Sequence, residues 1–330
     1  MVEARLSYVI GVDAGSTKTD AVVANLEGRA LGTGRSGCAN WELVGETGAA
    51  GTIHDAIRHA LDKSGADLRD VRHVHVGAAG LDWPEDDSRL RGALDPLLGS
   101  VPLTLENDSF LGARACTPTA SGITVSAGSG VCASYLGSTD AKYFYGYFGE
   151  LGGGTAIDQL ALHAILRAED GRGPKTLLTS AIPTATGHSS VRALLHALTR
   201  EGYELTHTLI RPSLFETASR GDAVAIDVVT TFGRELGLMA SNLIEKYRLQ
   251  STGVHVVASG SLFTRTGPLL FDVFREVVHR TDPSAKAKLN DRPPVAGAVR
   301  AALQACGVQT TVTTGTWEAV SSSYEGALDA

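Results

Sequence analysis

The sequence is poor in cysteine and has no long apolar run, and each shortage excludes a class of protein. Its four cysteines are scattered among 330 residues without a CxxC pair, which excludes a disulfide framework and the usual zinc and iron–sulfur spacings. No stretch reaches the roughly 18 apolar residues of a membrane-spanning helix. Residues 1–6 lack the basic-then-apolar pattern of a secretion signal. We therefore expect a cytoplasmic protein with reduced thiols.

Basic residues are not in excess either. The chain has 29 Lys and Arg against 36 Asp and Glu, for a formal net charge of −7. This balance provides neither the basic surface that binds nucleic acid nor a polybasic membrane patch. A small-molecule partner is therefore expected, with no nucleic acid and no membrane.

Glycine, by contrast, is abundant. The 38 glycines exceed the usual share of about 7% and form short clusters between apolar runs. Such clusters indicate backbone turns rather than flexible linkers.

The expected elements follow a similar order in the two halves of the chain. The first half is predicted to hold strands over residues 8–13, 21–25, 29–33, 71–76 and 102–106 and helices over 46–63, 86–98 and 108–115. The second half is predicted to hold strands over 123–126, 131–136, 141–145 and 254–258, a mostly helical region over 155–247, and helices over 269–279 and 294–304. This pattern predicts an α/β protein of two related domains with a cleft between them. The predicted domains are 1–120, closed by the helix at 294–305, and 121–293 with a helical insertion, followed by a peripheral tail at 308–330.

The sharpest local motif is Asp13–Asp20, where an acidic residue ends a strand and a turn of glycine and hydroxyl residues follows. Backbone N–H groups and hydroxyls in such a turn can bind phosphate oxygens, and the Asp13 carboxylate can hold a hydrated magnesium ion. The same residues would equally form an ordinary tight hairpin. Similar turns follow two later strands, at Ala127–Gly130 and Ser259–Ser261, where glycine lets a flat group approach the backbone.

Several stretches in a fixed order carry a family resemblance that covers about residues 8–305. They are Val12–Thr19, Ala39–Trp41, Gly77–Asp82, Glu106–Asp108, Ser126–Gly130, Gly149–Gly154, Ser259–Ser261 and Pro294–Ala298. With them the chain resembles the N-acetylglucosamine kinase branch of the BadF/BadG/BcrA/BcrD ATPase family, in the actin-like, sugar-kinase and Hsp70 superfamily. The resemblance implies two actin-like (ribonuclease H-like) domains that flank a cleft for ATP and substrate.

The resemblance also implies ATP and Mg²⁺ as cofactors and assigns residues to them. Asp13 would hold the metal ion. The residues expected to bind the nucleotide are Gly15, Ser16, Thr17 and Lys18 in the first turn, Gly128, Ser129 and Gly130 in the second, and Gly260 and Ser261 near adenosine.

A sugar pocket is implied as well, formed by Asn40, Trp41, Asn107, Asp108, Tyr145, Gly146 and Glu150. Asp108 follows a strand and begins a helix, so its position alone favours a helix N-cap. Phosphoryl transfer to a sugar hydroxyl needs a carboxylate that orients the alcohol and accepts its proton. With the resemblance, we interpret Asp108 as this catalytic base.

The chain departs from the family at Gly149–Gly154, where the family signature usually reads Gly-Asp-Glu-Gly-Ser-Gly. Glu150 is a longer carboxylate where the family uses aspartate, and Leu151 removes a charge. Both changes fall on the part of the pocket that contacts the acceptor. We therefore expect retained transfer machinery and leave the sugar open among N-acetylglucosamine, glucosamine and a related sugar.

Three alternative functions remain open. An ATPase activator of a dehydratase or reductase system, also known in this family, would carry an iron–sulfur cluster on paired cysteines, which the scattered cysteines disfavour. A kinase could act instead on an unrelated sugar-like or aminoglycoside-type metabolite. A sugar-sensing module would not need Asp108. By analogy, the expected assembly is a homodimer.

Other patterns are interpreted as structural. Residues 32–37 match GxGxxG, but no helix begins directly after them, so a dinucleotide site is not expected. His73 and His75 alternate with valines along a strand, and we expect the pair to face solvent rather than a metal. Glu85–Asp87 is expected to be a solvated helix start.

Overall fold

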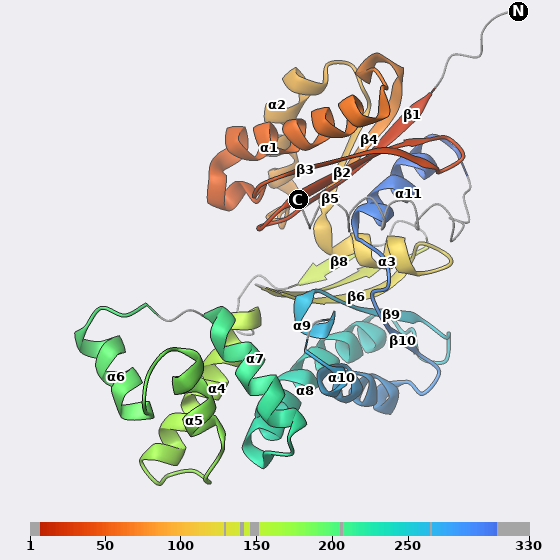
Figure 1. Ribbon diagram of the computed structural model, residues 1–330. Helices are drawn as coiled ribbons and strands as arrows, with labels where there is room; N and C mark the ends of the chain where they lie inside the picture. The colour runs from red at the N-terminus through yellow and green to blue at the C-terminus, as the bar shows by residue number, and fades with distance from the viewer. Residues whose placement is uncertain are drawn as a thin grey trace, which may run out of the picture. The chain divides into compact units, whose positions relative to one another are not determined.

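The computed structural model describes residues 7–128, 130–138, 142–145, 152–204, 207–264 and 266–308. In this part the chain is an α/β protein with two five-stranded sheets, which confirms the expected fold class (Figure 1). It divides into two compact units. The described residues within Met1–Gly122, Ser134–Phe144 and Asn290–Ala330 form unit 1, and those within Ile123–Ala133 and Tyr145–Leu289 form unit 2.

The first sheet has the strand order β3-β2-β1-β4-β5 and belongs to unit 1. Its elements are β1 (Tyr8–Ala14), β2 (Thr19–Asn25), β3 (Ala30–Ser36), β4 (Val71–Ala78) and β5 (Leu103–Asn107), with helices α1 (Trp41–Ser64), α2 (Pro84–Leu98), α3 (Leu111–Cys116) and α11 (Val295–Ala305) and 3₁₀ turns η1 (Leu68–Asp70) and η2 (Asp108–Phe110). Strand β1 is antiparallel to β2 and parallel to β4, which is parallel to β5. The carboxyl ends of β1, β4 and β5 therefore meet at one edge of this sheet.

Alternating side chains along β1 explain how both faces of the first sheet are covered. Ile10 and Val12 are fully buried in the core that α1 and α2 complete. Gly11 faces α11, whose backbone is so close that a Cβ atom there would lie 2.2 Å from the Val299 nitrogen. Figure 1 shows α1 and α2 on one side of the sheet and α11 on the other.

The glycine-rich residues 32–37 serve close packing between β3 and α1. A Cβ atom on Gly32 would lie 2.3 Å from the carbonyl oxygen of Ala60, and one on Gly34 would lie 1.9 Å from that of Ala56. Any larger residue would push the helix off the strand. The glycines of the GxGxxG match therefore allow the close approach of α1 to β3.

The second sheet has the order β10-β9-β6-β7-β8, and β9 is parallel to both β10 and β6. Its strands are β6 (Gly122–Ala127), β7 (Val131–Leu136), β8 (Lys142–Tyr145), β9 (His255–Ser259) and β10 (Lys286–Leu289). The helices of unit 2 are α4 (Gly153–Glu169), α5 (Leu178–Ala185), α6 (Val191–Arg200), α7 (His207–Ser219), α8 (Ala223–Lys246), α9 (Ser261–Thr264) and α10 (Pro268–Thr281). Helix α8 begins after Asp222, whose side chain accepts a hydrogen bond from the Ala225 amide at 2.9 Å.

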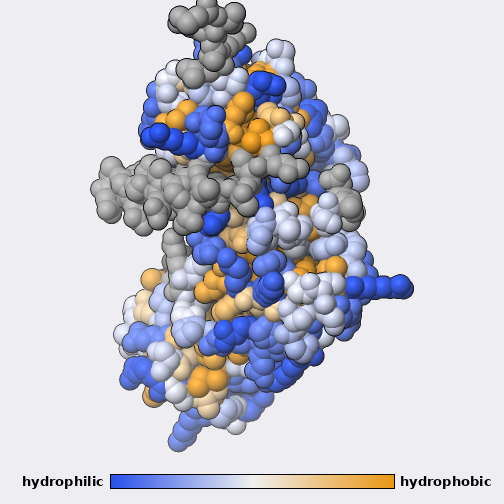
Figure 2. Space-filling view, turned by 90° about the vertical axis from the view of Figure 1, so that its right-hand side faces the viewer, coloured by the Kyte–Doolittle hydropathy of each residue, from blue (hydrophilic) through white to orange (hydrophobic). Residues whose placement is uncertain are grey.

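No helix in the described ranges is both long and apolar enough to span a membrane. Figure 2 shows small hydrophobic areas between hydrophilic ones on the face in view. Residues 309–330, which make up almost all of the expected tail, lie outside the described residues.

Candidate functional site

The first candidate site lies at the edge of the first sheet where β1 ends. Asp13 is partly buried there, and the turn after it is closed by a hydrogen bond from the Gly15 amide to the Lys18 carbonyl at 3.0 Å. Thr17 and Lys18 are exposed on this turn. The Gly15 carbonyl also accepts a hydrogen bond from the Ala39 amide at 3.0 Å, which holds the turn against the segment before α1.

Asn40 connects this turn to α1. Its Nδ2 donates to Ser16 Oγ at 3.1 Å, and its Oδ1 accepts from the Glu42 amide at 3.0 Å as the N-cap of α1. Asn40 therefore does cap the loop, the alternative role considered for it, and it also contacts Ser16 in the turn Gly15–Lys18 (the phosphate-type turn).

A loop after β4 packs against the same helix start. Trp41 Nε1 donates to the Gly80 carbonyl at 2.5 Å. Gly80 has a φ of 82°, and a Cβ atom on it would lie 2.7 Å from Asn40 Oδ1, so only glycine fits here. The Ala79 amide donates to the Ala14 carbonyl at 2.9 Å, which ties the loop to the end of β1.

Asn107 holds this loop to the end of β5. Its Nδ2 donates to Asp82 Oδ1 at 2.8 Å and to the Leu81 carbonyl at 3.3 Å, while its Oδ1 accepts from the Ser109 amide at 3.0 Å. Asn107 is therefore the N-cap of the turn Asp108–Phe110, the role considered for Asp108 from the sequence. Sequence reasoning assigned no role to Asp82, although it ends the Gly77–Asp82 stretch.

Three carboxyls in this site have raised pKa values. Burial, and then the charge of Asp108, raises the pKa of Asp13 to about 7. Burial, and then the charge of Asp82, raises the pKa of Asp108 to about 6, against the effect of nearby backbone N–H groups. Burial with the charges of Glu42 and Asp86 raises the pKa of Asp82 to about 6. Asp108 is thus close enough to Asp13 and to Asp82 for its carboxylate to repel theirs.

Lys18 is held at the base of the turn by an ion pair. Its ammonium contacts the buried carboxylate of Asp20, which also accepts from Arg35 Nε at 2.7 Å. Because Arg35 stays paired with Asp20, Lys18 can leave Asp20 for an anion without isolating a buried charge.

Unit 2 holds the other turns expected to bind the nucleotide. The Gly128 carbonyl accepts from the Gly154 amide at 2.8 Å, so the turn after β6 meets the start of α4. Gly260 has a φ of 95°, and a Cβ atom on it would lie 2.3 Å from the Ala127 carbonyl oxygen. The segments at Ala127–Gly128 and Gly260–Ser261 are therefore in direct contact within unit 2.

A pocket of about 590 Å³ opens beside Ser261. It is lined by Arg211, Pro212, Phe215, Glu216 and Ser219 of α7 and by Ser261, Leu262, Thr266 and Gly267. The Arg211 guanidinium pairs with the buried Asp158 at 3.2 Å. The α7 wall was not predicted from the sequence because no local motif marks it.

Some expected site residues lie outside the described residues. Ser129, Gly146 and Glu150 belong to this group, and of Tyr145 only the backbone, at the end of β8, is described. In the described ranges, no group of three or more His, Cys, Asp or Glu side chains could hold a metal ion.

Two expectations about surface residues are wrong. His75 does not face solvent: it is 3% exposed and its Nε2 lies 2.9 Å from Glu106 Oε1. Asp86 is 4% exposed, and its carboxylate accepts from the Asp82 and Trp83 amides at 3.0 and 2.7 Å. Both side chains are buried because they hydrogen-bond to neighbouring segments of the fold. Strand alternation and charge runs in the sequence do not predict such contacts.

The two sheets and their helices define an actin-like sugar-kinase fold. The ROK family glucokinase from Streptomyces griseus, solved with glucose and AMPPNP, matches with a TM-score of 0.58 at 20% identity, over 90% of this chain and 98% of that chain. The chain belongs to the BadF/BadG/BcrA/BcrD ATPase family, which matches residues 10–305 and confirms the resemblance.

Curated relatives with assigned activities match most of the chain. The chain is 25% identical over 306 residues to an N-acetylmuramic acid/N-acetylglucosamine kinase of Clostridium acetobutylicum, covering 91% of this chain and 100% of the relative. It is 26% identical over 231 residues to the glucosamine kinase GspK of Vibrio cholerae, covering 68% of this chain and 76% of the relative.

Proposed function

We propose that this chain transfers the γ-phosphoryl group of ATP to a hydroxyl of an amino sugar such as N-acetylglucosamine or glucosamine. The observation that carries the proposal is the buried Asp108 carboxyl, which lies close enough to Asp13, just before the turn Gly15–Lys18, for its charge to raise the pKa of Asp13. The curated relatives named as amino-sugar kinases support the acceptor class.

Asp108 acts as the base in this proposal. With a pKa of about 6 it is ionised at neutral pH and still basic enough to accept a proton. It orients the acceptor alcohol, whose oxygen forms a bond to the γ-phosphorus. The bond from that phosphorus to the β,γ-bridging oxygen breaks, the hydroxyl proton passes to Asp108, and ADP leaves.

Asp13 would hold Mg²⁺. Its pKa of about 7 reflects burial and negative neighbours, and a divalent cation would relieve that repulsion. Magnesium commonly uses one or two carboxylates and completes its shell with water and phosphate oxygens, so a single carboxylate suits it. The ion would supply neutralisation of the phosphate charge.

The nucleotide is assigned to two groups of residues. The turn Gly15–Lys18 binds phosphates through backbone N–H groups and hydroxyls. The turn Gly128–Gly130 keeps its predicted phosphate-binding role. Ser261 and the pocket beside it bind the nucleoside, since the pocket volume of about 590 Å³ lies within the range of roughly 300–1,000 Å³ usual for small-ligand sites.

The acceptor is assigned to Asn40, Asn107 and Asp108 of unit 1. Trp41, which follows Asn40, supports it through the hydrogen bond to the Gly80 carbonyl. Tyr145, Gly146 and Glu150 keep their predicted acceptor role. A homodimer and a cytoplasmic location also stay predictions.

An ADP-release assay with ATP and Mg²⁺ tests the proposal. The acceptors are N-acetylglucosamine, glucosamine, glucose and an aminoglycoside, with the Asp108→Asn protein as the blank. Release that depends on an amino sugar supports the proposal. Release with the aminoglycoside alone, or without any acceptor, contradicts it.

A further inference from the structure

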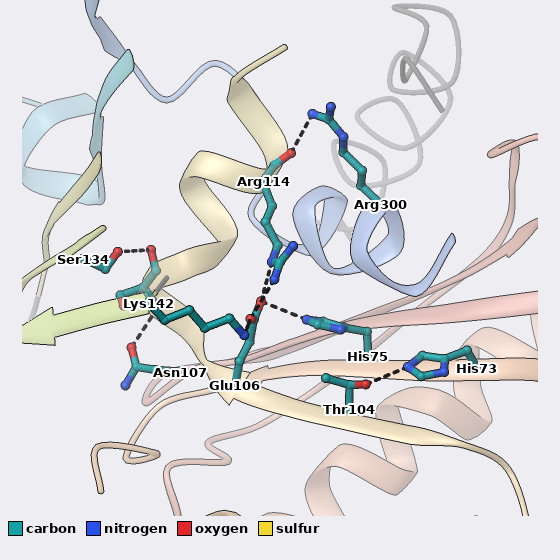
Figure 3. A network of polar contacts seen from close by, with 10 residues as sticks. His73, His75, Thr104, Glu106, Asn107, Arg114, Ser134, Lys142 and Arg300 are labelled. Atoms are coloured by element: carbon teal, nitrogen blue, oxygen red, sulfur yellow. Dashed lines mark hydrogen bonds and ion pairs between the residues drawn. The ribbon is translucent and has the colours of Figure 1, made fainter. Parts of the chain in front are cut away.

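Glu106, two residues before Asp108, is the centre of a buried network of ion pairs and hydrogen bonds (Figure 3). The Glu106 side chain is 2% exposed. Its carboxylate contacts His75 Nε2 of β4 at 2.9 Å, Arg114 Nε of α3 at 2.7 Å, and Lys142 Nζ of β8 at 2.7 Å. Side chains from three other elements therefore converge on one carboxylate at the end of β5.

The network is charged. Burial raises the pKa of Glu106, but the hydrogen bond from His75 and the Arg114 guanidinium outweigh it and hold that pKa well below its usual range. Burial lowers the pKa of His75, against the hydrogen bond and charge of Glu106, which raise it, and the charges of Arg114 and Lys142 lower it further. Glu106 is therefore an anion between the Arg114 guanidinium and the Lys142 ammonium, with the His75 ring as its third partner.

The network surrounds the turn that carries Asp108. Glu106 precedes the turn and Arg114 follows it, so their ion pair joins the two ends of the segment. Lys142 Nζ also lies 5.5 Å from the ring centroid of Phe110, within cation–π distance. Ser134 Oγ of β7 donates to the Ser109 carbonyl at 3.0 Å.

The helix after the turn is fixed as well. Arg300 of α11 is 6% exposed, and its Nη1 donates to the Arg114 carbonyl at 3.1 Å and to the Thr117 carbonyl at 2.6 Å. The end of α3 thus cannot shift without breaking buried bonds. Arg114 is held at both its backbone and its guanidinium.

We propose that Glu106 is a positioning residue for phosphoryl transfer: paired with Arg114 and Lys142, it fixes the turn on which Asp108 stands. This rests on the proposed function, in which Asp108 is the base. Buried ion pairs contribute little to stability compared with apolar packing of the same volume, so stability alone does not call for this carboxylate. Accurate placement of Asp108 does call for it, since an error of about 1 Å at a reacting group can cost about 10²-fold in rate.

Lys142 offers the cleanest test because its side chain is 35% exposed and its removal leaves Glu106 paired with Arg114. Three full-length variants are compared: Lys142→Met, Lys142→Arg, and Lys286→Met on β10 as the matched control. In Lys142→Met we expect kcat to fall about tenfold or more while the KM for ATP changes less than about threefold. We expect Lys142→Arg to recover most of kcat and Lys286→Met to equal the wild type.

Amide hydrogen exchange over residues 108–111 supplies a readout independent of activity. We expect exchange there to be about tenfold faster in Lys142→Met than in the wild type, with the rest of the chain unchanged. Unchanged kcat or unchanged exchange in Lys142→Met overturns the inference. A wild type that phosphorylates no sugar contradicts the proposed function, and faster exchange in Lys142→Met would still support the positioning of the turn.

Discussion

The side-chain amide of Asn40 donates a hydrogen bond to Ser16 Oγ at 3.1 Å. One residue is expected to bind the acceptor and the other the phosphates, and they are 24 positions apart in the sequence. Asn40 also caps α1, so one side chain contacts both the turn Gly15–Lys18 and the start of that helix. The residue proposed to bind the acceptor and the residue proposed to bind the phosphates are therefore linked by a hydrogen bond inside unit 1.

Asn40→Ala is expected to lower the free energy of unfolding by about 1 kcal/mol, because it removes an N-cap. It is also expected to raise the KM for ATP as well as for the sugar. Thermal unfolding and initial rates measure both effects. Ser190→Ala, which removes the N-cap of α6, is the control: it should lower stability similarly and leave both KM values unchanged.

The Asn40–Ser16 bond itself is tested by a double-mutant cycle. Asn40→Ala and Ser16→Ala should be non-additive in the KM for ATP, because each removes the same bond. Additive effects would mean that the bond does not link the two residues functionally.

Asp108→Asn is expected to reduce kcat by about 10²–10⁴-fold, the usual contribution of a general base. The fold should persist, since Asn107 rather than Asp108 caps the turn. Asp95→Asn, on the exposed side of α2, is the matched control and should keep full activity. Retention of wild-type kcat by Asp108→Asn would remove the base from the mechanism.

The pH profile should report the raised pKa of Asp108. The base works only when ionised, so kcat/KM should fall as the pH drops through about 6. Asp82→Asn removes a negative charge that raises this pKa, so the acid limb should move to lower pH. A limb that stays in place or moves to higher pH would contradict the role of Asp82.

Gly260→Ala is expected to destabilise unit 2 by about 1–3 kcal/mol through overpacking against Ala127, beyond the backbone strain at its positive φ. It should also raise the KM for ATP. Gly253→Ala is the control, since Gly253 has a φ of 68° but no atom closer than 3.6 Å to its added Cβ. Equal losses of stability in the two variants would show that the contact with Ala127 is unimportant.

The sequence predicted the fold class and the local turns well, because hydrophobic period and glycine placement are local signals. It predicted a helix from residue 46, and the longer part of α1 does begin there, because Gly45, with a φ of 73°, interrupts the helix; the short first part from Trp41, which Asn40 caps, was not predicted. Contacts between segments far apart in the sequence were harder to predict. The burial of His75 against Glu106 depends on the pairing of β4 with β5, which no local residue pattern predicts.

The candidate site shows the same division. Asp13 was predicted from a motif at the end of a strand, and Asn40 and the base role of Asp108 were predicted from the family resemblance; these roles stay predictions. Asp82 and the α7 wall of the pocket were missed, because their importance comes from contacts made only in the folded chain. Asn107 shows a further limit: its amide is occupied by Asp82, Leu81 and Ser109, so residue type alone could not reveal its bracing role.

The most direct measurement is the transfer of ³²P from γ-labelled ATP to glucosamine and to N-acetylglucosamine in the presence of Mg²⁺, with the product separated and identified by mass. The proposed function predicts a labelled sugar monophosphate from at least one of the two amino sugars with the wild type, and a yield lower by about 10²-fold or more with Asp108→Asn. Labelled inorganic phosphate alone, or equal sugar phosphate from both proteins, would contradict it.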